Sequence, residues 1–152
     1  MRSAFVILGF IGWSCAALAQ STAPGVIAMT PAEMKWGPQG GLTVAGLEQT
    51  NLVGSPAQSG PYTIRLKFPA GYKVAPHTHP DSREVTILSG TWRTGYGEKF
   101  DAAALKALPA GSFFTEPANV PHFIEIKEDV VLQVSGTGPS GRKFVNPEDS
   151  PK

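Results

Sequence analysis

The sequence predicts an all-β domain, and three observations support that class. Runs of alternating apolar and polar residues begin about every ten residues through the second half of the chain. The 152 residues include 17 Gly and 14 Pro, which suit many tight turns. Charged residues amount to only 16%, fewer than we expect in a helical bundle. These features favour a β-sandwich or barrel, whose mouth is a natural pocket for a small ligand.

The clearest predicted strand covers residues 62–68. Tyr62, Ile64, Leu66 and Phe68 fall on one face with polar residues between them, as in a half-buried strand. Leu42 to Leu52 has room for one or two further short strands. The other predicted strands are short β-branched or apolar runs, many of them next to Gly, Pro or charged turns: residues 84–88, 91–94, 111–115, 122–126, 130–134 and 142–145.

Two short helices are expected between these strands. The first is predicted to begin at Thr30, because a Thr cap is followed by Pro31 at the first position and Glu33 at the third. It cannot run far, because a Gly-Pro pair follows. The second helix is predicted over residues 100–108, capped by Asp101 and ended by the next proline.

Residues 1–19 have the features of a secretory signal peptide. Arg2 supplies a positive start, an apolar run follows, and Ala17-Leu18-Ala19 matches a signal-peptidase site, so cleavage is expected between Ala19 and Gln20. The apolar run is shorter than the ~20 residues that a membrane span needs. We therefore expect a periplasmic or secreted protein, with no stable membrane insertion after cleavage.

Removing the leader leaves a chain of balanced charge without cysteine. The 13 basic residues lose Arg2 and become 12, against 12 acidic residues, so no basic field for nucleic acid is expected. The single cysteine, Cys15, also lies in the leader. Any metal must then be bound through nitrogen and oxygen ligands.

Three histidines form the candidate metal site. His77 and His79 are two residues apart, so in an extended chain both side chains point to the same side. The third, His122, stands at the start of another predicted strand, and Glu84 follows the pair closely. A set of imidazoles with or without a carboxylate suits divalent Fe, Mn, Ni, Cu or Zn.

The chain resembles the cupins. Their first motif contains Gly, His-x-His, Glu and Gly in that order, and Gly71, His77, His79, Glu84 and Gly90 follow it. Their second motif places a histidine after a proline, and Pro117 and His122 are similar to it, with one extra residue between them. Ile126 stands where that motif has an Asn.

The resemblance implies a conical double-stranded β-barrel, jelly-roll-like, with a metal near its centre. The ligands would be His77, His79 and His122, with Glu84 as a fourth. On this basis the barrel is expected over residues 60–146, after an irregular arm (20–59) and before a polar tail (147–152). A homodimer is expected only by analogy with cupins that pair through their sheets.

The carboxylate position is open between two neighbours. Counted from His79, Glu84 lies where the cupin Glu belongs, but counted back from Gly90 that place is occupied by Arg83. A shift of one residue reverses the face of a strand, so only one of the two points inward. We expect Glu84 to face the metal, because a carboxylate lowers the cost of burying a dication. If Arg83 faces inward instead, its guanidinium could hold an anionic substrate.

Other pocket candidates are aromatic or polar residues on the predicted strands. Phe68, Trp92 and Phe113 are expected near the mouth of the barrel, and Gln133 is the polar residue of an apolar run.

Three functions agree with these features. One is metal-dependent chemistry on a small organic molecule, for example by a dioxygenase, or by a decarboxylase or isomerase. Another is a non-catalytic periplasmic module that binds a metal or a small anion. The third is a metal that only stabilises a cysteine-free domain. Cupins include enzymes and non-enzymes, so the fold does not decide between these functions.

Overall fold

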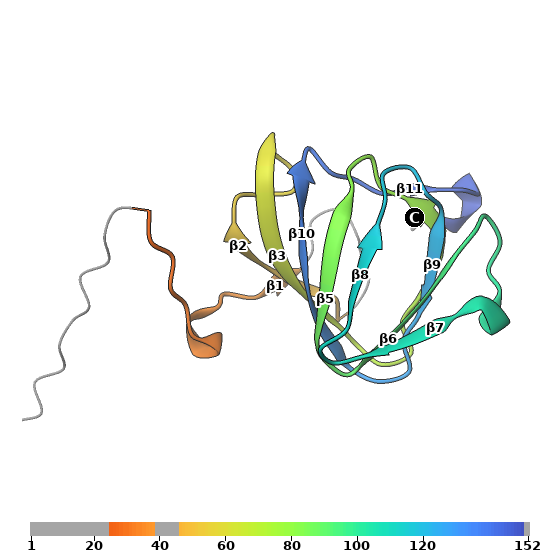
Figure 1. Cartoon of the computed structure of the whole chain (residues 1–152), viewed down its shortest axis with the longest axis horizontal. Helices are drawn as coiled ribbons and strands as arrows, with labels where there is room; N and C mark the ends of the chain where they lie inside the picture. Colours follow the sequence, from red (N-terminus) through yellow and green to blue (C-terminus); the bar gives the residue numbers. More distant parts are fainter. Residues whose placement is uncertain (1–24, 39–45, 151–152) are drawn as a thin grey trace, which may run out of the picture.

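The computed structural model describes residues 25–38 and 46–150 (Figure 1). They form two antiparallel β-sheets and three 3-10 turns, which confirms the all-β class. The predicted signal peptide, residues 1–19, lies outside the described residues, as do residues 42–45. The rest of the segment 42–52 contains one of the predicted short strands, β2 (Glu48–Val53). No helix in the described ranges is long and apolar enough to cross a membrane.

The first sheet has six strands in the order β1-β2-β3-β10-β5-β8. Its strands are β1 (Gly37–Pro38), β2 (Glu48–Val53), β3 (Gly60–Phe68), β5 (Arg83–Ser89), β8 (Phe113–Glu116) and β10 (Val130–Gly138). The second sheet has five strands in the order β11-β4-β9-β6-β7. Its strands are β4 (Lys73–Thr78), β6 (Thr91–Tyr96), β7 (Lys106–Pro109), β9 (His122–Glu125) and β11 (Lys143–Phe144).

The two sheets do not close into the predicted conical barrel. Each described strand pairs only within its own sheet, so the arrangement is a two-layered sandwich of jelly-roll type. Strands that are distant in sequence become neighbours, since β10 lies between β3 and β5 (Figure 1). In the second sheet, β9 lies between β4 and β6.

The core lies between the facing sides of the sheets. In β3 the predicted alternation is confirmed, because Tyr62, Ile64, Leu66 and Phe68 are all buried. The ring of Phe68 meets the ring of Trp92 from the opposite sheet edge-on, with centroids 5.0 Å apart. This apolar packing closes the sandwich beside the histidine cluster.

The helix predicted over residues 100–108 was wrong in length. Residues 100–108 form one 3-10 turn, η2 (Ala102–Ala104), followed by strand β7. The Asp101 cap is present, since its carboxylate accepts a hydrogen bond from the Ala103 amide at 2.8 Å. A helix of only nine residues over 100–108 would be marginally stable by itself. Pairing of β7 with β6, which places Leu108 opposite Trp92, buries more apolar surface than such a helix would. The other turn, η1 (Pro31–Glu33), keeps the predicted Thr30 capping box but ends after three residues.

Candidate metal centre

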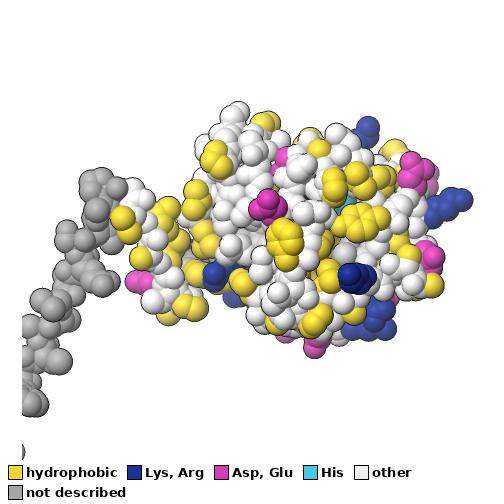
Figure 2. All heavy atoms as spheres, viewed as in Figure 1, with side chains coloured by type: hydrophobic (Ala, Val, Ile, Leu, Met, Phe, Trp, Pro, Cys, Tyr) yellow, Lys and Arg dark blue, Asp and Glu magenta, His cyan; other side chains and the backbone are white. Residues whose placement is uncertain are grey.

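The structure brings together all three histidines of the chain. His77 on β4 lies directly opposite His122 on β9 in the strand register, and His79 follows the end of β4. Their ligand atoms lie within 4.8 Å of one another. The three side chains are only 1%, 3% and 1% exposed, and little histidine surface is visible in Figure 2. The two sheets therefore place the predicted residues around one buried point.

Backbone carbonyls fix the orientation of each imidazole ring. Nδ1 lies 2.8 Å from the Ala75 carbonyl oxygen in His77 and 3.2 Å from that of Val120 in His122, and in His79 it contacts the Gly141 carbonyl. Because a carbonyl only accepts hydrogen bonds, Nδ1 is the protonated nitrogen in the neutral rings. The Nε2 lone pair then remains for a ligand, as in metal-binding histidines.

Burial keeps two of these rings neutral. Desolvation, reinforced by the neighbouring His122 and Arg142, lowers the pKa of His77 from its usual 6.5 to about 2. Desolvation and the nearby Arg83 guanidinium lower the pKa of His79 to about 2 as well. Both imidazoles are thus in the ligating form at neutral pH.

Glu84 does not face the histidines, so that expectation was wrong. In β5 the buried residues are Val85 and Ile87, so Arg83 shares their inward face while Glu84 is exposed on the outside. The physical reason is the period of two along a strand, which gives adjacent residues opposite faces. The structure decides the open alternative in favour of Arg83.

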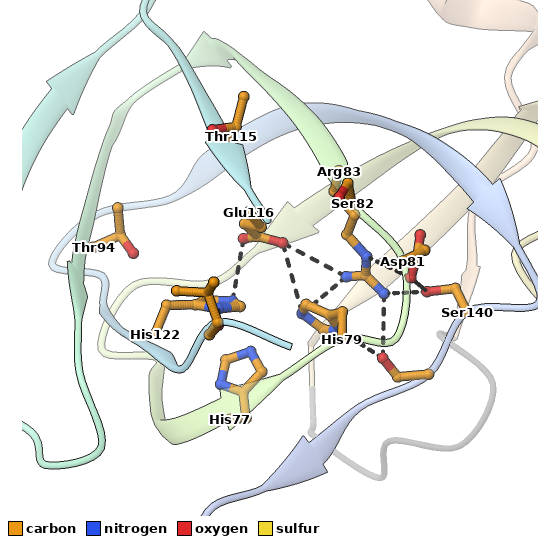
Figure 3. A network of polar contacts seen from close by, with 12 residues as sticks. His77, His79, Asp81, Ser82, Arg83, Thr94, Thr115, Glu116, His122 and Ser140 are labelled. Atoms are coloured by element: carbon orange, nitrogen blue, oxygen red, sulfur yellow. Dashed lines mark hydrogen bonds and ion pairs between the residues drawn. The ribbon is translucent and has the colours of Figure 1, made fainter. Parts of the chain in front are cut away.

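Glu116 brings a carboxylate to the cluster instead, which the sequence analysis missed. It lies at the end of β8, opposite Arg83 in the register, and is only 5% exposed. One carboxylate oxygen is 3.4 Å from Nε2 of His122 and the other is 3.6 Å from Nε2 of His79 (Figure 3). Alternation with the half-buried Phe114 was the available signal, because residues 114 and 116 share a face of that strand.

The environment of Glu116 favours its ionised form. Burial alone would raise the pKa of this carboxyl group, but the adjacent His122 and the Arg83 guanidinium lower it below its usual range. Nη1 of Arg83 is 3.8 Å from the carboxylate. The cluster therefore contains a buried carboxylate at neutral pH.

Arg83 is held by a polar network at one end of the cluster. Its Nη1 donates a hydrogen bond to Nε2 of His79 at 3.0 Å, and its Nη2 donates to the Ser140 hydroxyl. Ser140 in turn donates to Asp81 (Figure 3). The other Asp81 oxygen accepts a hydrogen bond from the Tyr62 hydroxyl at 2.6 Å. The buried Tyr62 and Asp81 thus support the loop that positions the guanidinium.

We expect Tyr62→Phe to lower the free energy of unfolding by about 1–3 kcal/mol, because it leaves a buried Asp81 oxygen without its donor. Urea unfolding followed by circular dichroism measures the loss. Tyr96→Phe is the matched control, since the Tyr96 hydroxyl donates to the Thr115 carbonyl in an exposed position where water can replace it. Equal losses in the two variants would contradict this role of Tyr62.

A cavity of about 50 Å³ adjoins the cluster between the sheets. Phe68, Trp92 and Arg83 line it, as predicted. The prediction that Phe113 and Gln133 line the pocket was wrong. Phe113 is 59% exposed, and the amide of Gln133 accepts a hydrogen bond from Arg65 at 3.2 Å on the outer face of the sheet. Both residues alternate with more deeply buried residues of the same strand, so they point to the opposite, outer face.

The donor set fits a divalent metal. The ligand atoms of the three histidines lie within 4.8 Å of one another, and the Glu116 carboxylate is close to two of these residues. Buried Nε2 of His122 has no hydrogen-bond partner among the described residues. Ligands about 2.1 Å from one ion in tetrahedral geometry lie about 3.4 Å apart, similar to the separation of Glu116 and His122. His79 would exchange its hydrogen bond from Arg83 for the ion. The ionised Glu116 carboxylate would offset part of the charge of a cation bound at this point.

Fold and site together define a cupin-type β-sandwich with a three-histidine centre. The chain belongs to the family of the ChrR cupin-like domain, whose model matches residues 24–141. The expected membership of the cupins is confirmed. A search of curated protein sequences found no match to this chain.

Several solved structures share the fold. A putative acetylacetone dioxygenase from Methylibium petroleiphilum is 24% identical, with a TM-score of 0.62 over 88% of this chain and 90% of that one. The polyketide cyclase RemF from Streptomyces resistomycificus is 13% identical, with a TM-score of 0.64 over 82% and 90%. The DMSP lyase DddQ from Ruegeria pomeroyi is 17% identical, with a TM-score of 0.59 over 80% and 72%. Similarities at this level of identity establish the fold.

Proposed function

We propose that this protein binds one divalent transition metal through His77, His79, His122 and Glu116 and acts on a small organic molecule. The observation that carries the proposal is the cluster of three buried imidazoles, with a buried carboxylate beside two of them. The adjoining cavity, with mainly apolar walls, supports a small-molecule ligand. Fe, Mn, Ni, Cu and Zn all suit this donor set.

Each group of the site has a separate role in this proposal. A metal bound by these residues would supply a Lewis acid. The carbonyl contacts at Nδ1 hold the three rings in the ligating tautomer, and Glu116 offsets part of the cationic charge. The apolar walls, including Phe68 and Trp92, exclude water from the cavity. A dioxygenase is the reaction class that needs the fewest further acids or bases.

The test combines metal analysis with activity. Protein purified from the periplasm is expected to contain about one divalent transition metal ion per chain. Oxygen consumption with small phenols and keto acids then tests for a dioxygenase. Protein that contains no transition metal would contradict the proposal at its first step.

A non-catalytic metal- or anion-binding module is the second candidate. It is favoured by the few titratable groups that line the cavity, since its acids and bases are two of the histidines, Glu116 and two arginines. Metal binding without turnover of any tested substrate would support this alternative. For either function we propose export through residues 1–19, and N-terminal sequencing that begins at Gln20 would support it.

Glu116→Gln is expected to weaken metal binding roughly 10- to 100-fold, because the amide keeps the shape but removes the negative charge beside the ion. Metal affinity is measured by competition with a chromogenic chelator. Glu84→Gln is the matched control, because Glu84 lies on the neighbouring strand β5, opposite Thr115, but faces outward. A larger effect at Glu84 than at Glu116 would show that the carboxylate is assigned to the wrong residue.

A further inference from the structure

Arg142 is a second arginine in the cavity, and the metal site does not explain it. It lies just before β11 and lines the cavity together with His77, His79 and Arg83. Its Nε is buried and has no hydrogen-bond partner among the described residues. Burial, together with the like charge of Arg83, lowers the pKa of Arg142 in spite of the nearby Tyr72 hydroxyl.

The two arginines differ in the carboxylates that balance their positive charge. Arg83 has Asp81 at 3.6 Å and Glu116 at 3.8 Å. For Arg142, no carboxylate of the described residues lies within ion-pair distance, and its guanidinium is instead 5.9 Å from the Phe144 ring. Arg142 is partly buried, and the charge of Glu116 reaches it only from beyond ion-pair distance, so this position favours an anion.

The charge of the cavity supports the same conclusion. Arg83 and Arg142 contribute +2, and Glu116 with Asp81 behind Arg83 contributes −2, so these four groups leave no net charge. Adding the proposed dication gives +2. A cavity with mainly apolar walls would then gain most from a ligand that carries negative charge.

We propose that the cavity binds a small carboxylate, with its negative charge beside Arg142 and its carbon end against the apolar walls. This inference rests on the proposed metal-dependent function and adds the substrate class. A planar carboxylate matches the planar fork of a guanidinium. The walls are formed by aliphatic and aromatic side chains: Ile64, Leu66, Phe68, Val85, Trp92 and Ile124. Since a cavity of 150 Å³ holds the six carbons of benzene, 50 Å³ encloses only about two non-hydrogen atoms without rearrangement, which suits only the smallest carboxylates.

Acetate and acetamide provide an isosteric pair of probes for the charge. Zn-loaded protein is titrated with each probe, and binding is followed by amide chemical-shift changes in NMR spectra. We expect acetate to bind at least tenfold more tightly than acetamide. Arg142→Met is expected to abolish this preference with unchanged zinc content, and Arg142→Lys is expected to restore part of it.

Arg93→Met is the control, because Arg93 pairs with Glu125 outside the cavity and its loss should leave acetate binding unchanged. If Arg142→Met does not fold, the Arg142→Lys variant and the acetate–acetamide comparison in the wild type still test whether Arg142 binds the carboxylate. Equal affinity for the two probes, or an acetate preference that survives in Arg142→Met, would overturn the inference. Zinc content is measured on the same samples. A protein that binds no zinc contradicts the proposed function. If that zinc-free protein still prefers acetate to acetamide, the result supports the role of Arg142.

Discussion

Replacing both His77 and His122 by alanine is expected to remove bound metal completely. The two residues face each other across β4 and β9, with ring centroids 4.2 Å apart, and together they supply two of the three converging nitrogens. One imidazole and one carboxylate would remain, too few to compete with water for a divalent ion. Elemental analysis of wild type and double variant, purified in parallel, measures the difference.

The control for this experiment is Gln133→Ala. Gln133 was predicted to lie in the pocket but faces outward, so its variant should keep the metal content of the wild type. Circular dichroism establishes that each variant is folded before metal content is compared. Equal metal content in the double variant and the wild type would refute the histidine site.

Acidification is expected to unfold the chelator-treated protein below about pH 5. His77 and His79 have a pKa of about 2 in the folded protein and 6.5 when unfolded, so the unfolded chain binds more protons between these values. Stability is therefore complete above pH 6.5 and falls as the pH decreases. Each histidine contributes a slope of about 1.4 kcal/mol per pH unit, which makes about 5 kcal/mol for the pair by pH 4.5. That loss is similar to the total stability of many small domains.

Urea unfolding from pH 8 to pH 4 in the presence of a chelator measures this dependence. His77→Gln is the informative variant, because it removes one of the two titrating groups and should reduce the slope by about half. The lowered pKa of Glu116 acts in the same direction, but only below the normal range of a carboxylate. A free energy of unfolding that stays constant between pH 7 and pH 5 would show that these histidines are not buried in neutral form.

The local pattern of the sequence predicted much of the fold. Alternation in residues 62–68 identified the buried face of β3, because a half-buried strand shows its orientation in the residues themselves. The segment 100–108 was wrongly predicted as a helix, because its Asp101 cap is typical of a helix while its last residues pair with β6. That pairing depends on a strand distant in sequence and is not encoded locally. The two sheets do not close into the predicted barrel for the same reason: strand pairing depends on the whole chain and not on local sequence.

The carboxylate of the site shows where sequence reasoning ends. Motif spacing left Glu84 and Arg83 as alternatives, and the preference for Glu84 came from the chemistry of the metal. Packing decided otherwise, because burying Val85 and Ile87 forces Arg83 to the inward face. Glu116 was absent from the analysis because it lies on β8, which becomes the neighbour of β5 only after folding.

The sequence by itself determined the all-β class and the three histidines, since strand alternation and the His-x-His spacing are local properties of the chain. The tertiary structure alone decided which charged groups surround those histidines. Glu116, Arg83 and Arg142 come from three separate segments, and they share one cavity only because β5 pairs with β8 and the segment before β11 borders the same space between the sheets. Long-range pairing, which satisfies backbone hydrogen bonds and buries the apolar faces, therefore set the charge of the site.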